Sequence, residues 1–182
     1  MNQEFTLTIF SENSIGLLNR ITIIFTRRKL NIESLTVSES ALKGVFKFTI
    51  VVNCDEHMAK NLTKQIEKQI DVIRAFYLRA DEILHQEIAM YKIETKSLLE
   101  TNLIEGIIRR YNARILELTQ DYTVIEKTGH KAETQELFEQ LKPYGVLQFV
   151  RSGRVSITRL RKEHLSSYLE NLEKGHRNPV MD

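Results

Sequence analysis

The residues with the clearest chemical potential form a polar turn, residues 12–18, with a glycine at position 16. The backbone amides near Leu17 and Leu18 open a predicted helix, and unpaired N–H groups at a helix start can bind an anion such as a carboxylate. Gly16 has no side chain and lets a ligand approach the backbone closely. The turn therefore has the chemistry of an anion site.

Two asparagines extend this chemistry to a positive group. Asn13 lies in the turn and Asn31 opens the strand that follows the helix. Each offers a carbonyl oxygen to an ammonium and an amide to a carboxylate. Together with the turn they suit a zwitterionic amino acid. An ordinary turn is the competing interpretation, because asparagine and glycine are common turn residues.

The sequence lacks the motifs of the common catalytic sites. Its five histidines show no metal-ligand spacing, and it contains no phosphate-binding G-x-x-x-x-G-K-[ST] loop and no G-x-S-x-G turn. Its carboxylates are not clustered. The single cysteine, Cys54, follows a predicted strand, where a structural thiol is favoured over a nucleophile. We expect no catalytic residue, no metal site and no cofactor bound by this chain.

The composition is that of an ordinary globular protein. The 182 residues are 42% hydrophobic and 27% charged, and 26 basic against 24 acidic side chains give a net charge of +2. This near balance does not favour a general nucleic-acid or membrane binder. No apolar run approaches the roughly 20 residues that span a bilayer, and the N-terminus lacks the features of a signal peptide. We expect a soluble cytoplasmic protein.

The elements that must position the turn follow one order twice. Apolar periodicity predicts a strand, a helix, two strands, a helix and a strand at 3–10, 17–29, 32–39, 45–53, 55–70 and 72–78. The same order is predicted at 87–94, 98–111, 113–119, 122–128, 131–144 and 146–150. This order is the ferredoxin-like unit. The predicted fold class is α+β, with two tandem ferredoxin-like βαββαβ domains at 1–80 and 81–160.

The end of the chain has a different pattern. In residues 161–182, Leu165, Tyr168, Leu169 and Leu172 recur at helical spacing, which predicts an amphipathic helix followed by a frayed tail. Such a helix can pack on its own domain or contact a partner.

A basic cluster precedes this tail. No acidic residue lies between positions 151 and 162, whereas Arg151, Arg154 and Arg159 fall there. A solvated surface is the ordinary interpretation. The alternative is that these arginines dock on an acidic face of a partner protein.

RNA binding is a further alternative to consider. Residues 43–50, KGVFKFTI, loosely match the RNP1 pattern of RNA-binding ferredoxin-like sheets. In such domains the aromatic residues lie on the exposed sheet face. Here the alternation places Phe46 and Phe48 on the apolar face with Ile50, and leaves Lys47 and Thr49 on the open face. The pattern therefore argues against RNA binding.

Residues 12–20, ENSIGLLNR, and residues 30–37, LNIESLTV, resemble the ACT domain of the acetolactate synthase small subunit. The run NIESLTV is specific to that subunit rather than to ACT domains in general. In the second half, residues 122–124, Gly129 and residues 150–153 resemble the C-terminal domain of the same family.

The resemblance implies a non-catalytic regulatory subunit in the biosynthesis of valine, isoleucine and leucine. Its partner would be the large subunit of a transferase that carries thiamine diphosphate, FAD and Mg²⁺. The small subunit would activate this enzyme and confer feedback inhibition by branched-chain amino acids, chiefly valine. It would form a homodimer through its ACT domains, with effectors bound between protomers. The implied effector-binding residues are Asn13, Gly16, Leu17, Leu18, Asn31 and Ile32.

Two other functions remain as alternatives to this interpretation. A free-standing ACT-type amino-acid sensor would bind the same ligand without a catalytic partner, and the match in the second half disfavours it. An RNA-binding ferredoxin-like protein is the third alternative.

Overall fold

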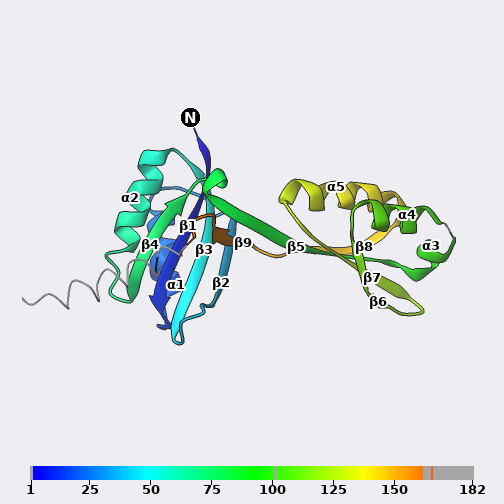
Figure 1. The fold of residues 1–182 in the computed structure, drawn as a ribbon, viewed down its shortest axis with the longest axis horizontal. Helices are drawn as coiled ribbons and strands as arrows, with labels where there is room; N and C mark the ends of the chain where they lie inside the picture. Colours follow the sequence, from blue (N-terminus) through cyan, green and yellow to red (C-terminus); the bar gives the residue numbers. More distant parts are fainter. Residues whose placement is uncertain (1, 101, 162–164, 166–182) are drawn as a thin grey trace, which may run out of the picture. The chain divides into compact units, whose positions relative to one another are not determined.

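The computed structural model describes residues 2–100, 102–161 and 165 of the chain (Figure 1). These residues form two compact units. The first contains the chain up to Leu84 and again from Ser156 onward, and the second contains His85–Val155. Within the described residues no helix is long and apolar enough to cross a membrane.

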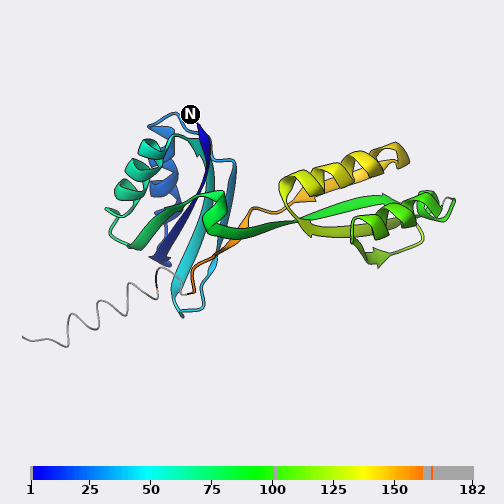
Figure 2. The ribbon, with the colours of Figure 1, turned by 45° about the horizontal axis from the view of Figure 1, so that its top comes forward.

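Unit 1 is a four-stranded antiparallel sheet with strand order β2-β3-β1-β4 and two helices. Its elements are β1 (Gln3–Glu12), α1 (Leu17–Thr26), β2 (Ser34–Glu39), β3 (Val45–Cys54), α2 (Glu56–Ile66) and β4 (Val72–Leu78). Both helices lie on the same side of the sheet (Figure 2). This arrangement is the predicted ferredoxin-like order.

The core of unit 1 comes from the alternation in its two central strands. Leu7 of β1 lies opposite Ile50 of β3, and both side chains are fully buried. The neighbouring core pairs are Phe5 with Val52 and Ile9 with Phe48. Full burial of one such side chain contributes about 1.5–3 kcal/mol. The apolar face predicted for Phe48 and Ile50 is therefore confirmed.

Helix α1 ends three residues earlier than the sequence predicts. Lys29 adopts a left-handed conformation with φ of 53°. The N–H of Leu30 donates to the carbonyl of Phe25 at 3.1 Å, and the N–H of Lys29 donates to that of Thr26 at 3.0 Å. This pair of bonds is a Schellman motif, which satisfies the last carbonyls of a helix and turns the chain.

The second face of the unit 1 sheet is covered by chain that returns from position 156. Strand β9 (Val155–Thr158) pairs with β5 (Ile83–Glu94), and Ser156 and Thr158 line a narrow cleft together with Phe10. The ammonium of Lys47 donates to the carbonyl of Ser156 at 3.0 Å. Because of this cover, Phe10 is buried, although the sequence indicates a strand with one open face.

Because the chain returns to unit 1, the two compact units differ from the two domains predicted from the sequence. The sequence places residues 81–160 in one domain, whereas the compact second unit comprises residues 85–155. The N–H of Arg159 donates to the carbonyl of Glu82 at 2.9 Å, which joins the two ends of this segment inside unit 1. Unit 2 is thus inserted into unit 1 instead of following it.

Unit 2 repeats the fold around β5. Its further elements are α3 (Thr95–Glu100), α4 (Asn102–Arg110), β6 (Arg114–Leu118), β7 (Tyr122–Gly129), α5 (Lys131–Leu141) and β8 (Val146–Arg151), and its main strand order is β6-β7-β5-β8. Tyr91 fills its core, and the phenol donates to the carbonyl of Thr134 at 2.6 Å. Burial raises the pKa of Tyr91 to about 12.

The predicted fold class, two βαββαβ units, is confirmed. Two short 3₁₀ helices, Ala80–Glu82 and Lys142–Tyr144, complete the described elements. The amphipathic helix predicted within 161–182 lies outside the described residues, apart from Arg161 and Leu165.

Candidate functional site

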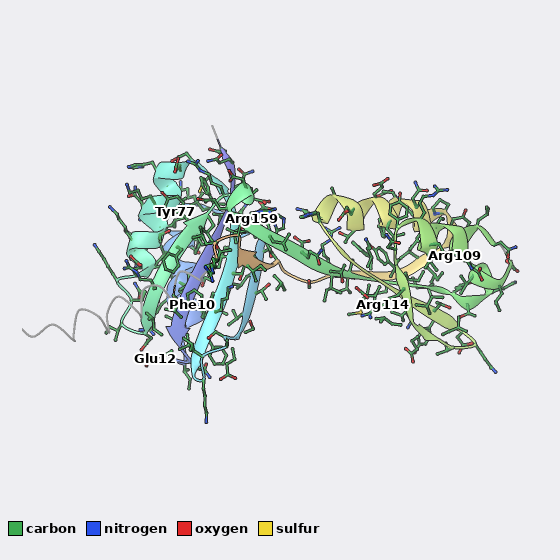
Figure 3. All side chains as sticks on the ribbon, viewed as in Figure 1. Phe10, Glu12, Tyr77, Arg109, Arg114 and Arg159 are labelled. Atoms are coloured by element: carbon green, nitrogen blue, oxygen red, sulfur yellow. The ribbon has the colours of Figure 1, made fainter. Side chains whose placement is uncertain are left out.

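The glycine turn joins the end of β1 to the start of α1, next to Glu12, which is labelled in Figure 3. Gly16 is the N-cap residue of α1 and has φ of 82° and ψ of −3°. This is the left-handed region, which favours glycine. No atom lies within 4 Å of the position that a Cβ would take at Gly16. The requirement for glycine is therefore conformational, and the space in front of its backbone is open.

The turn leaves two helix amides available. The N–H of Leu17 donates to the carbonyl of Ser14 at 3.3 Å, and that of Arg20 donates to the carbonyl of Gly16 at 3.1 Å. Between them, the N–H groups of Leu18 and Asn19 have no partner within the described part of the chain, and no side chain caps the helix. The first turn of α1 contains no acidic residue. Free amides at the positive end of a helix dipole favour a bound anion.

The six predicted effector residues do not all present side chains to this space. Leu17 is 1% exposed and belongs to the core, so only its backbone lies at the turn. Leu18 is 42% exposed, and Ile32 is partly buried against the core. Asn13 and Asn31 are exposed. The side chains of Leu18 and Ile32 can therefore contact an aliphatic group, whereas the side chain of Leu17 cannot.

The two asparagines lie at opposite ends of the unit 1 sheet. Glu12 pairs with Val45 at one end, and Asn13 follows it. Ser34 pairs with Val51 near the other end, and Asn31 precedes it. Helix α1 separates them, and ten helical residues span about 15 Å. One protomer therefore cannot bring both asparagines to one amino acid.

An ion pair that the sequence did not predict supports the turn. The guanidinium of Arg20, on α1, contacts the carboxylate of Asp71, in the turn before β4. Arg20 is part of the ENSIGLLNR run, but nothing local in the sequence marks Asp71, which is 51 residues away. Only the packing of the two turns at one end of the sheet brings them together.

The predicted docking arginines have partners within the chain. Arg151 donates to the Gln135 side chain at 3.1 Å, and its Nε lies 3.7 Å from a carboxylate oxygen of Glu87. The Arg154 side chain is buried. Arg159 donates through Nε to the carbonyl of Ile83 at 3.0 Å. Arg151 and Arg154 are thus not part of a freely solvated basic surface, since buried charges require partners within the fold, whereas Arg159 is exposed.

The described residues show little chemistry beyond this. They include no group of three or more His, Cys, Asp and Glu side chains that could hold a metal ion. Cys54 is buried, and burial raises the pKa of its thiol, which keeps it protonated near neutral pH. On the sheet face that RNA-binding proteins use, Thr49 is buried and Lys47 bonds to Ser156.

Comparison with known proteins gives one consistent result across both units. Residues 7–74 match the family model described as "AHAS small subunit-like ACT domain". Residues 86–160 match that described as "Small subunit of acetolactate synthase".

Whole-chain relatives agree with the two matches. The chain is 36% identical to the acetolactate synthase small subunit of Bacillus subtilis over 168 residues, which cover 92% of this chain and 96% of that protein. It is 34% identical to the acetolactate synthase small subunit of Mycobacterium leprae over 154 residues, covering 85% and 90%. The fold resembles the crystal structure of the small subunit from Thermotoga maritima, with a TM-score of 0.79, 22% identity, and coverage of 88% of this chain and 99% of that chain.

Proposed function

The chain belongs to the family of acetolactate synthase small subunits, and from this premise we propose that it activates the large subunit and makes that enzyme sensitive to branched-chain amino acids, chiefly valine. The chain itself is a regulatory subunit and not a catalyst. The observation that carries the effector part of the proposal is the Gly16 turn: a left-handed glycine with open space at its Cβ position precedes the amides of Leu18 and Asn19, which have no partner among the described residues. The large subunit would hold the thiamine diphosphate, FAD and Mg²⁺ that the chemistry needs.

A homodimer would complete the effector site. Strand β2 is an edge strand of the unit 1 sheet, and its outer edge is available to a second copy. Pairing around a two-fold axis makes the two β2 strands antiparallel, so the end of one protomer that carries the turn meets the end of the other that carries Asn31. This arrangement would place Asn31 of the partner subunit beside Asn13 and the Gly16 turn.

Exposed apolar side chains near this edge support the dimer. Leu18 on α1, Val37 on β2 and Leu42 in the β2–β3 hairpin are 42%, 40% and 42% exposed. A second copy along β2 would cover such side chains, and its own strand would hydrogen-bond to the outer edge of β2. The dimer therefore accounts for both the apolar side chains and the open edge.

The groups at the turn match an α-amino acid. Its carboxylate would accept hydrogen bonds from the amides of Leu18 and Asn19, and its ammonium would donate to the side-chain carbonyls of Asn13 and of Asn31 of the partner subunit. Leu18 of this protomer and Ile32 of the partner subunit would contact the aliphatic side chain. Because the effector touches both protomers, its binding would favour one dimer arrangement, and the large subunit would sense this as a shift between two states.

Acetolactate formation from pyruvate tests the proposal directly. We expect no product from this chain alone with all cofactors, a basal rate from the cognate large subunit, and a higher rate when both are mixed. Valine should lower the rate of the mixture and leave the basal rate much less affected. Turnover by this chain without large subunit, or no change on mixing, would contradict the proposal.

The free-standing sensor is distinguished by its partners. Capture of the tagged chain from its native extract should co-purify a thiamine-diphosphate enzyme if the regulatory function holds. A sensor without a catalytic partner would bind valine in calorimetric titration and capture no such enzyme. The match of residues 86–160 to the small-subunit family supports the regulatory function.

Replacing Asn31 with alanine is expected to weaken valine inhibition about fivefold. The change removes one hydrogen-bonding partner, worth about 1 kcal/mol. The measurement is the valine concentration that gives half-maximal inhibition of the reconstituted enzyme. Asn61→Ala is the matched control, because Asn61 is a partly exposed asparagine on α2 that bonds only to His57 among the described contacts. If Asn31→Ala and Asn61→Ala required the same valine concentration for half-maximal inhibition, Asn31 would not belong to the effector site.

A further inference from the structure

We propose that Asp71 and Arg20 are positioning residues for the effector: they hold the Gly16 turn in the conformation that presents its free amides. This inference rests on the proposed function, because it assigns a role to residues behind the proposed effector site. Neither side chain needs to touch the effector.

The first observation is that Asp71 joins three segments of unit 1. Its backbone carbonyl accepts from the N–H of Glu12, the last residue of β1, at 3.0 Å. Its carboxylate contacts the guanidinium of Arg20 on α1. The Ser14 side chain, inside the turn, lies close enough to this carboxylate to lower its pKa. Asp71 therefore holds the turn at its start, through Glu12, and one helical turn beyond it, through Arg20.

The carboxylate is suited to this role. The Arg20 guanidinium is the main cause that lowers the pKa of Asp71, and the nearby Ser14 side chain lowers it further. Asp71 therefore stays ionised at neutral pH and pairs with the Arg20 guanidinium. The Asp71 and Arg20 side chains remain 20% and 38% exposed, so a substitution at either position leaves no fully buried charge without a partner.

The second observation concerns the turn itself. Gly16 has a left-handed backbone conformation, no atom lies within 4 Å of its Cβ position, and no side chain caps the start of the helix. Local contacts in the turn are the N–H of Ser14 to Glu12 and the N–H of Leu17 to Ser14, at 3.0 and 3.3 Å. Such a turn would sample other conformations without further support, because glycine populates many backbone states. The contacts of Asp71 with Glu12 and with Arg20, one on each side of Gly16, provide that support.

Pre-ordering of the turn should appear directly in effector affinity. If the turn is loose, the effector must fix it on binding, and fixing the backbone of one residue costs about tenfold in an equilibrium constant. We therefore expect Asp71→Ala to weaken L-valine binding about tenfold, and Arg20→Gln to weaken it severalfold. The double variant should bind no more weakly than Asp71→Ala alone, because the two side chains act through one contact.

The experiment is calorimetric titration of the full chain with L-valine, together with thermal unfolding and hydrogen exchange of the backbone amides. The variants should exchange faster at residues 13–19, with melting temperatures close to that of the wild type. Arg79→Gln is the matched control, because it breaks an exposed Arg–Glu pair of the same unit, Arg79 with Glu56 at 2.7 Å, away from the turn. It should leave valine affinity unchanged.

The outcomes separate this inference from the proposed function. Wild-type affinity in Asp71→Ala and Arg20→Gln, with valine bound normally by the wild type, overturns the positioning role and leaves the proposed function intact. No binding of any branched-chain amino acid by the wild type overturns both. Equal weakening in Arg79→Gln, or weakening that follows a general fall in melting temperature, shows loss of stability instead of loss of pre-ordering and also overturns the inference.

Discussion

Gly16→Asp is expected to abolish valine inhibition of the reconstituted enzyme while most of the activation remains. The new carboxylate would lie beside the bound effector carboxylate. Two unit charges about 4 Å apart repel by about 4 kcal/mol at an effective dielectric constant near 20. Even a third of this energy weakens affinity about tenfold. The measurement is acetolactate formation against valine concentration, with saturating small subunit.

The backbone at position 16 requires a control for strain. A side chain there meets no atom within 4 Å, but φ of 82° disfavours residues other than glycine, at about 1–2 kcal/mol. Asparagine tolerates this conformation as well as aspartate does and has nearly the same shape without the charge. Gly16→Asn should therefore retain much of the inhibition. Unchanged inhibition in Gly16→Asp would place the effector elsewhere, and equal loss in both variants would assign the effect to the backbone.

Truncation after Arg79 is expected to destabilise unit 1 enough to cause aggregation or unfolding. The truncated chain keeps every element of the first predicted domain, but it loses Ile83 and Leu165, each 1% exposed, and it uncovers Phe10. Three such burials contribute roughly 5–9 kcal/mol. This is comparable with the whole stability of a domain, about 5–15 kcal/mol. Gel filtration and thermal unfolding of the truncated chain measure the loss.

A joined variant is the control for this truncation. The chain leaves unit 1 after Leu84 and re-enters it at Ser156. The two ends lie side by side, because the N–H of Arg159 bonds to the carbonyl of Glu82. A short glycine-serine linker from Leu84 to Ser156 should replace unit 2 and restore a monodisperse, cooperatively folding protein. Equal stability of the joined and truncated variants would mean that the returning segment contributes nothing to unit 1.

Within the fold, the sequence predicts what depends on neighbours along the chain. The period of two in residues 3–10 and the helical stripe from Leu17 determine which side chains face the core, and β1 and α1 have that arrangement. The features that the sequence does not predict lie on the sheet face away from the two helices. Residues Thr6, Thr8 and Phe10 look like an exposed face in the sequence, but all three are buried, and the segment that returns at Ser156 adds cover that no local pattern reveals.

For the candidate site, the residue types in the sequence predict the turn and the backbone N–H donors at the start of α1. The left-handed Gly16 and the free amides follow from the glycine, the polar turn and the helix that begins after it. The roles of individual side chains were less predictable. Leu17 belongs to the core, and Arg151 and Arg154 are drawn into contacts with their own chain. Exposure depends on every element packed around a residue, and residue type alone does not specify it.

The order of elements, the inward faces of β1 and β3, the turn and the family can be read from the sequence. Periodicity and turn chemistry act over a few residues, where backbone sterics and amphipathicity leave few alternatives. Three features required the packed fold: the insertion of unit 2 in unit 1, the contact of Arg20 with Asp71, and the placement of Asn13 and Asn31 at opposite ends of one sheet. These features depend on contacts between residues far apart in the chain, 51 positions for Arg20 and Asp71 and 109 for Lys47 and Ser156. Such contacts form only when whole elements pack, so their geometry is a property of the assembled fold.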